Sequence, residues 1–212
     1  MNIDIAVLEL VCSRFCHDLI SPIGAVNNGL ELLEDEQDPA LVAEARGLAE
    51  RSAKRASHLL QTYRSAFGNA GNQAGFGLGE SLKLAREFLD GGRVALGPLP
   101  AVVPSDLIPG FPKLLLLGIM LMSETLPRGG TLSFTVSGEG AGAGFRLVAE
   151  GQPATANEDW QSSLSGKQPD ALDARNVLPF FIGLVAKRLG MALTLTGGGN
   201  GRVELSAAPG GN

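Results

Sequence analysis

Apolar side chains recur three and four residues apart through the first third of the chain, which is the spacing of one face of a helix. This pattern predicts two long antiparallel helices, at about residues 3–34 and 39–67, with Asp38 and Pro39 placed to start the second. In the first helix the stripe consists of Ile5, Leu8, Cys12, Phe15, Leu19, Pro22, Val26, Gly29 and Leu33. In the second it consists of Val42, Ala45, Ala49, Ser52, Ala56, Leu59, Tyr63 and Ala66, widened by Leu41, Leu48, Leu60 and Phe67.

A single hairpin of two helices cannot bury stripes this wide, because half of each stripe would remain in water. Two hairpins that pair into a four-helix bundle cover the remaining apolar surface. We therefore expect this part of the chain to form a homodimer.

Beyond residue 70, short alternating runs are mixed with helical spacing. The predicted strands are Arg93–Leu96, Thr131–Ser137, Phe145–Glu150, Ala192–Thr196 and Arg202–Ser206. The predicted helices are Leu78–Asp90, Leu107–Leu126 and Asp173–Leu189. This order fits an α/β sandwich with helices on one face of a mixed sheet, so the whole chain is expected to be α+β.

Glycine also separates the two parts of the chain. Of its 29 glycines, Gly24, Gly29 and Gly47 alone lie in residues 1–67, and the segment 68–75 has the composition of a flexible linker. We therefore expect a helical unit over residues 1–70 and an α/β unit over residues 71–212.

Charge and hydropathy exclude several classes of protein. A net charge of -5 and a pI of about 5.1 argue against a nucleic-acid binder, which normally presents a basic face. The longest apolar run, Leu114–Met122, is far shorter than the ~20 residues of a membrane span. The first residues carry no basic signal segment, and two cysteines four positions apart on one helix cannot staple a fold. We expect a cytoplasmic protein.

The candidate chemistry lies in the middle of the first helix. At ~100° per residue, His17 falls about 170° from the centre of the apolar stripe, so its imidazole should face solvent. Asp18 follows directly, Arg14 and Ser21 flank the histidine on the same surface, and Pro22 interrupts the helix one turn later. An exposed imidazole is a good nucleophile near neutral pH, and a neighbouring carboxylate can orient it.

Three plainer interpretations stay open at this point. His17 could be an ordinary surface histidine. Cys12, Cys16 and His17 could suggest a metal site, but Cys12 lies in the stripe while His17 points away, so these ligands do not converge. His58 falls at a surface position of the second helix and is less suited to be a second acceptor.

The segment Phe15–Pro22 resembles the phosphoacceptor box H-[DE]-x-x-x-P of histidine kinase dimerisation domains. More narrowly, residues 16–25, 28–35 and 59–68 resemble the ChpT-type histidine phosphotransferases of alphaproteobacteria. The resemblance extends over the whole chain and is strongest over residues 11–68. It implies a dimeric hairpin and a second domain like the histidine kinase ATPase fold but without its activity. It also implies that His17 takes a phosphoryl group from the receiver domain of a hybrid histidine kinase and passes it to response regulators.

The second half departs from a working ATPase in its own residues. Residues 127–134 match the turn and strand that follow the Mg²⁺-binding asparagine in kinases, but the asparagine position falls near Leu121, and no Asn occurs from 107 to 135. Leucine cannot supply the oxygen ligand that Mg²⁺ requires. After the next strand, kinases carry a motif with two glycines that approaches the adenine. Here Gly151 is present and the second glycine is missing. We expect no resident nucleotide or metal, and Mg²⁺ to be supplied by the partner receiver.

Function is thus expected to be phosphotransfer, with His17 as the acceptor and Asp18 orienting its ring. Residues expected to contact the phosphoryl group or the docked receiver are Leu10, Ser13, Arg14, Ser21, Gly24 and Asn28. Gly24 and Gly29 have no side chains, so they would allow another protein to approach that surface closely. Two alternatives remain at this stage: a sensor histidine kinase-like protein that binds ATP, and a non-catalytic dimeric adaptor.

Overall fold

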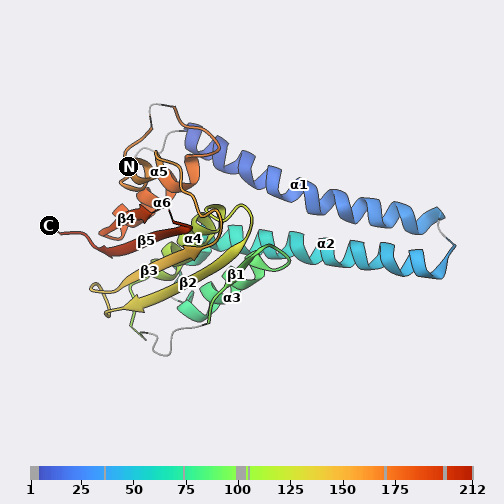
Figure 1. Ribbon diagram of the computed structural model, residues 1–212, viewed down its shortest axis with the longest axis horizontal. Coiled ribbons are helices and arrows are strands. Elements are labelled where there is room, and N and C mark those ends of the chain that lie inside the picture. Colours follow the sequence, from blue (N-terminus) through green and yellow to red (C-terminus); the bar gives the residue numbers. More distant parts are fainter. Residues whose placement is uncertain are drawn as a thin grey trace.

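The computed structural model describes residues 5–35, 37–73, 75–98, 104, 106–169, 171–197 and 200–211. A long helical hairpin projects from an α/β unit (Figure 1). It consists of α1 (Ile5–Asp35) and α2 (Pro39–Ala66), which confirms the predicted helices to within a few residues. The side chain of Asp38 accepts a hydrogen bond from the Ala40 N–H at 2.8 Å, so the predicted cap is present.

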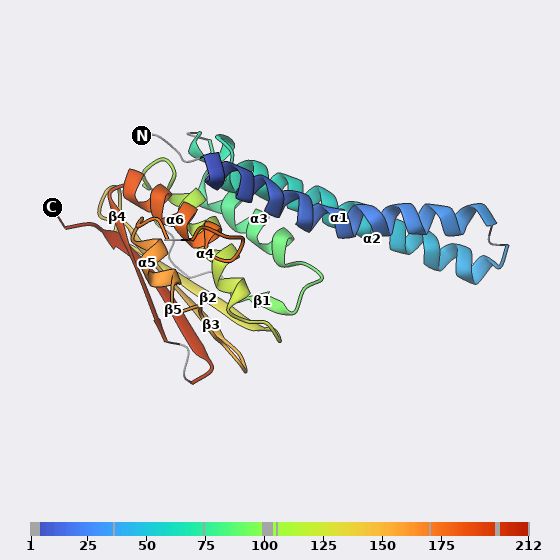
Figure 2. The same ribbon diagram turned by 90° about the horizontal axis from the view of Figure 1, so that it is seen from above.

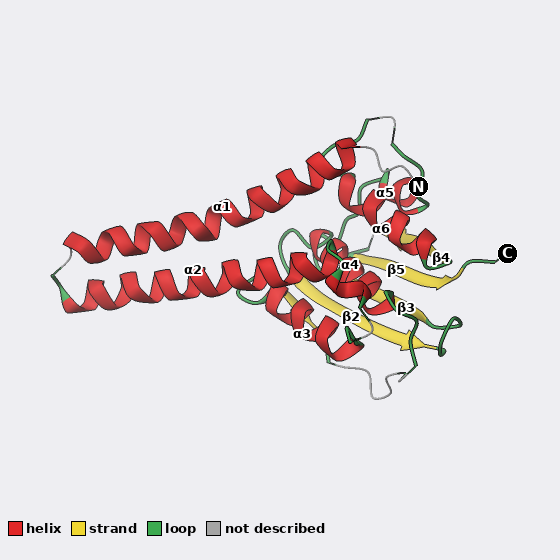
Figure 3. Cartoon of the chain, turned by 180° about the vertical axis from the view of Figure 1, so that it is seen from behind, coloured by secondary structure: helices red, strands yellow, loops and turns green. Residues whose placement is uncertain are grey.

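The sheet has five strands in the order β1-β2-β3-β5-β4. Their bounds are β1 (Val94–Leu96), β2 (Gly130–Ser137), β3 (Gly144–Glu150), β4 (Met191–Gly197) and β5 (Arg202–Pro209). The β1–β2 pair is parallel and the other pairs are antiparallel, so the sheet is mixed, as the sequence predicts. Figure 3 shows the strands of the sheet in yellow and the two long helices of the hairpin in red.

The helices of the α/β unit gather on one face of the sheet (Figure 2). They are α3 (Leu78–Leu89), α4 (Phe111–Glu124), the short α5 (Trp160–Leu164) and α6 (Val177–Arg188). From Phe111 to Met122, helix α4 is buried on all sides, since it contacts the sheet as well as α2, α3 and α6, and these residues are apolar except for Lys113. The opposite face of the sheet is open to water and carries ion pairs such as Arg146–Glu204 and Arg202–Glu150.

Two helix starts differ from the prediction. Helix α4 begins at Phe111 rather than Leu107, because Gly110 adopts a φ of 91° that ends the preceding turn. Helix α6 begins at Val177 rather than Asp173. The Asp173 carboxylate accepts hydrogen bonds from the N–H groups of Arg175 and Asn176, which form a turn before the helix.

The segment after α2 is packed, not a free linker. A 3₁₀ turn, η1 (Ala70–Asn72), follows α2, and its middle residue, Gly71, is buried. The Lys113 ammonium of α4 donates to the Gly68 carbonyl at 2.8 Å. The prediction of a flexible connection at 68–75 is therefore wrong for its described residues, while the division of the chain near residue 70 stays a prediction.

The apolar stripe of α1 divides into two faces. Val7 and Val11 are buried against Val177 and Phe180 of α6, and Gly29 is buried against Ala45 and Ala49 of α2. Cys12 is exposed in the single chain, where it borders the same apolar pocket as Leu8 and Leu19, so it lies on a part of the stripe that the chain itself does not cover. A second apolar face stays open to water, and its exposed members include Ile5, Leu8, Ile23 and Leu30 of α1 with Leu60 of α2.

Candidate functional site

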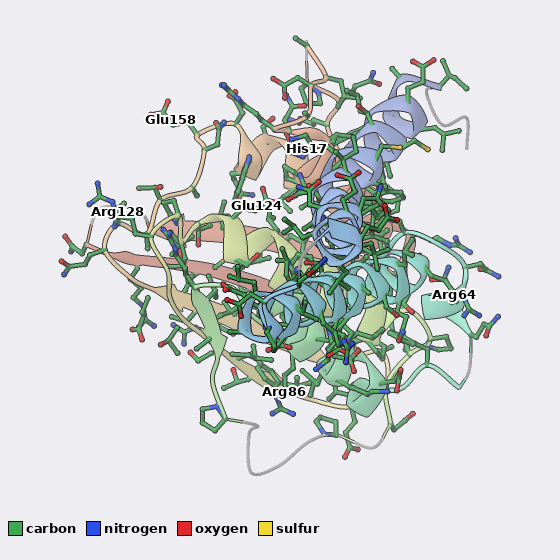
Figure 4. The ribbon with its side chains drawn as sticks, turned by 90° about the vertical axis from the view of Figure 1, so that its right-hand side faces the viewer. His17, Arg64, Arg86, Glu124, Arg128 and Glu158 are labelled. Carbon is green, nitrogen blue, oxygen red and sulfur yellow. The ribbon has the colours of Figure 1, made fainter. Side chains whose placement is uncertain are left out.

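His17 projects from the middle of α1 with 88% of its side chain exposed, which confirms the predicted outward orientation. Its Nδ1 lies 3.2 Å from Oδ1 of Asp18. The side chain can be followed in Figure 4, on the side of the molecule that also carries Glu124. A carboxylate at Nδ1 favours the tautomer whose proton sits on that nitrogen, and this leaves the lone pair of Nε2 open to solvent.

Asp18 is held from its other side by α2. The Tyr63 hydroxyl donates to Oδ2 of Asp18 at 2.5 Å. Burial, and after it the Asp18 hydrogen bond and charge, raise the pKa of Tyr63 well above its ordinary value. The phenol therefore stays protonated and remains a donor to the carboxylate.

Arg14, one turn before His17, connects α1 to the α/β unit. Its guanidinium donates to the carboxylate of Glu124 at the end of α4. Burial raises the pKa of Glu124, while the charge and hydrogen bond of Arg14 oppose that rise. Arg14 is thus already paired within the chain, whereas the sequence had suggested a guanidinium directed at a phosphoryl group.

The other residues expected around His17 share one side of α1. We call this side the docking strip; it comprises Leu10, Ser13, His17, Ser21, Gly24 and Asn28. Ser13, Ser21 and Asn28 are exposed, and Leu10 and Gly24 are half-buried. Gly29 does not belong to this surface, because it is buried between α1 and α2, so the expectation that it allows a close approach there is wrong.

An open groove of about 910 Å³ runs beside His17. Asp18, Ser21 and Pro22 line it from α1, while α2 contributes a row of basic and imidazole side chains. That row comprises Arg51, Lys54, Arg55 and His58. The far wall is the end of α3, where Arg55 donates to the Phe88 carbonyl and to the Asp90 carbonyl. Both histidines of the chain therefore line one groove, which also contains the carboxylates of Asp18 and Asp90, and Asp90 lies 4.0 Å from the Lys54 ammonium.

Sequence reasoning missed the roles of Tyr63 and Glu124. From the sequence, Tyr63 is placed only in the apolar stripe, and Glu124 has no functional role. The Tyr63 contact had no simple signal, because Asp18 lies 17 residues before the end of α1 whereas Tyr63 lies 24 residues after the start of α2, so equal spacing from the turn does not pair them. The Glu124 contact had none, because it joins residues 110 positions apart across different elements.

The features expected of a degenerate nucleotide domain can also be located. Leu121, at the position expected for the metal-binding asparagine, is completely buried in the core. Across the described ranges, no group of three or more His, Cys, Asp or Glu side chains is arranged to hold a metal ion. None of the helices in the described part of the chain combines the length and the hydropathy of a membrane span.

Comparisons with known proteins agree with this architecture. Residues 78–201 match the family described as the histidine phosphotransferase C-terminal domain. The protein phosphotransferase ChpT of Brucella abortus (strain 2308) is 34% identical over 198 residues, which is 88% of each chain. A solved structure described as a bacterial phosphotransferase is 30% identical, covers 98% of each chain and superposes with a TM-score of 0.79.

A helical hairpin with an exposed histidine, joined to a mixed sheet, is the architecture that this chain shares with proteins described as phosphotransferases. Both parts of the chain take part in these similarities, since the relatives span the hairpin and the α/β unit. The chain belongs to the histidine phosphotransferase family.

Proposed function

We propose that this chain carries a phosphoryl group on His17 between the aspartates of two receiver domains, one from a hybrid histidine kinase and one from a response regulator. In the first step Nε2 of His17 forms a bond to phosphorus, the bond from phosphorus to the aspartate oxygen breaks, and the electron pair leaves with that carboxylate. The reverse step on a second receiver discharges the histidine. Mg²⁺ stays in the acidic pocket of each receiver.

The observation that carries this proposal is the imidazole itself. It is 88% exposed on a convex helix, with Nδ1 against Asp18 and Nε2 open. Such a ring is accessible to the active site of another protein. Asp18 stabilises the positive charge that the ring gains when Nε2 is phosphorylated, so it is the second catalytic residue of the proposal.

The docking strip is proposed to bind the visiting receiver, with Ser21 and Ser13 beside the phosphoryl group and Gly24 and Asn28 further along. Arg51 and Arg55 on α2 support this, because their charge complements an acidic receiver surface. Arg14 contributes through Glu124, to which it is bound, by fixing the helix against the α/β unit.

Dimerisation through the hairpin is the second part of the proposal. An apolar groove of about 1000 Å³ lies at the base of the hairpin, where Leu8, Cys12, Leu19 and Leu60 line it together with residues of α6. A large exposed apolar face marks an interaction surface, and a second hairpin supplies the matching one. His17 lies on the other side of α1, so it stays accessible in such a bundle.

The test uses a receiver domain phosphorylated on its aspartate, mixed with the full chain. We expect an acid-labile, alkali-stable phosphoryl group to appear on the wild type and on His58→Gln, but not on His17→Gln. His58 is the matched control because it is the chain's other histidine and lines the same groove. Phosphorylation of His17→Gln, or labelling by ATP without a partner, would contradict the proposal.

A further inference from the structure

Tyr63 joins the histidine-bearing turn of α1 to the interior of the hairpin. Its ring is 5% exposed and stacks on Phe15, with the ring centroids 4.7 Å apart. Phe67 meets the same tyrosine edge-on at 5.8 Å. Two aromatic neighbours therefore fix the ring, and a buried phenol fixed in this way needs a hydrogen-bond partner. Its hydroxyl finds that partner in Asp18.

The two oxygens of Asp18 face two different groups. Oδ2 accepts from Tyr63 at 2.5 Å, while Oδ1 lies 3.2 Å from Nδ1 of His17. A carboxylate held only by solvent would rotate and exchange its oxygens. Here the bond to Tyr63 restricts that rotation, so Oδ1 stays directed at the imidazole.

We propose that Tyr63 is a positioning residue for phosphoryl transfer at His17, acting through the carboxylate of Asp18. The inference rests on the proposed function and adds a third group to it. Tyr63 keeps the carboxylate in place, the carboxylate keeps the proton on Nδ1, and Nε2 remains unprotonated for attack on phosphorus. When the N–P bond forms, the Nδ1 proton is shared with Asp18, and Tyr63 neither gives nor takes a proton. In metal sites, removal of a group that orients a ligating histidine typically costs 10–100-fold in affinity or activity, and we expect an effect of this order here.

The competing explanation is that Tyr63 only fills space among Phe15 and Phe67. Tyr63→Phe distinguishes the positioning role from the space-filling role, because it keeps the aromatic ring and removes only the hydroxyl. A matched control is the adjacent Thr62→Val, since Thr62 is also completely buried on α2 and its hydroxyl has no hydrogen-bond partner among the described residues.

The experiment measures by NMR which nitrogen of the His17 ring carries the proton. The chain has 2 histidines, so ¹⁵N-labelled imidazoles give a spectrum simple enough to assign by comparison with His58→Gln. We expect Tyr63→Phe to lower the fraction of His17 with its proton on Nδ1 and to slow transfer from a phosphorylated receiver about 10-fold. Thr62→Val should leave both unchanged. A space-filling role alone would not alter the tautomer.

A double variant adds a second criterion. Tyr63→Phe should slow Asp18→Asn no further, because the tyrosine is proposed to act only through that carboxylate. Additive losses, or a wild-type tautomer and rate in Tyr63→Phe, would overturn the inference.

Two further outcomes remain informative. If Tyr63→Phe does not fold, the ring signals of the chain's 1 tyrosine in NMR replace it. The ¹³C shift of Tyr63 Cζ should differ between the wild type and Asp18→Asn, and an unchanged shift would refute the coupling. If the wild type accepts no phosphoryl group at all, the proposed function fails, while the tautomer comparison still tests the contact between Tyr63, Asp18 and His17.

Discussion

Lys113 is a charged side chain in a location that lysine rarely occupies, since only 4% of the residue is exposed. It stays there because its ammonium donates to the Gly68 carbonyl at 2.8 Å. Burial, and after it the nearby charge of Arg188, lower its pKa from 10.5 to about 8. This residue therefore destabilises the fold while it is charged, and it links the stability of the protein to pH.

The sign of that link follows from proton binding. Between pH 8 and 10.5 the unfolded chain holds the Lys113 proton more tightly than the folded chain, so the free energy of unfolding should rise across this interval. The rise is on the order of 3 kcal/mol, at about 1.4 kcal/mol per pKa unit. Urea unfolding at both pH values should show that Lys113→Met removes this contribution.

Lys83→Met serves as the control, because Lys83 is an exposed lysine on α3. It should retain the wild-type dependence of stability on pH. Equal pH dependence in Lys113→Met and the wild type would show that Lys113 does not cause the effect.

At the level of the helices, the hairpin depends on one close approach. A Cβ at Gly29 would lie 3.0 Å from the Ala45 carbonyl oxygen and 3.0 Å from the Ala49 Cβ, both on α2. At Gly24, in the same helix, a Cβ would meet nothing within 4 Å. The two glycines therefore have different reasons to be present, and only Gly29 sets the spacing of the helices.

Substitution by leucine distinguishes them. Gly29→Leu should lower the free energy of unfolding by about 2 kcal/mol or more, because the backbone of α2 cannot move away without opening the hairpin. Gly24→Leu should be neutral or slightly stabilising, since leucine favours a helix by about 1 kcal/mol over glycine. Thermal unfolding measures both, and similar losses in the two variants would contradict this account.

For the whole molecule, the open apolar face is the surface through which the proposed dimer would form. Leu30 lies on this face, and Leu32 is about 200° around the helix at ~100° per residue. Their exposed fractions are almost equal, at 51% and 54%. Leu30→Lys should therefore convert the proposed dimer to monomer, whereas Leu32→Lys should not. Sedimentation velocity reports the mass, and a wild-type monomer or equal effects of the two variants would refute the dimer.

The sequence predicted those elements whose pattern is local. The helical stripes located α1 and α2, and alternation located the five strands, because each signal lies within one segment. The five-residue α5 was missed, since it is too short to show a period. The orientation of His17 was predictable because it depends only on its register within α1.

Contacts between distant segments explain what could not be predicted. Arg14 meets Glu124 only after α4 has packed under the hairpin, and no pattern in either segment signals the other. The exposure of Cys12 has a related reason: the spacing of apolar residues does not say whether α2, α6 or a second molecule covers each part of the stripe.

The nearly complete exposure of the imidazole has a cost for selectivity. A ring with 88% of its surface in water is not enclosed by its own chain, so nothing there shields a labile N–P bond from hydrolysis or rejects an unsuitable donor. Fidelity and lifetime must then come from the visitor that covers the ring. Selectivity among partners is then a property of each pair of contacting surfaces. It can be changed by altering either surface while the chemistry at the histidine stays the same.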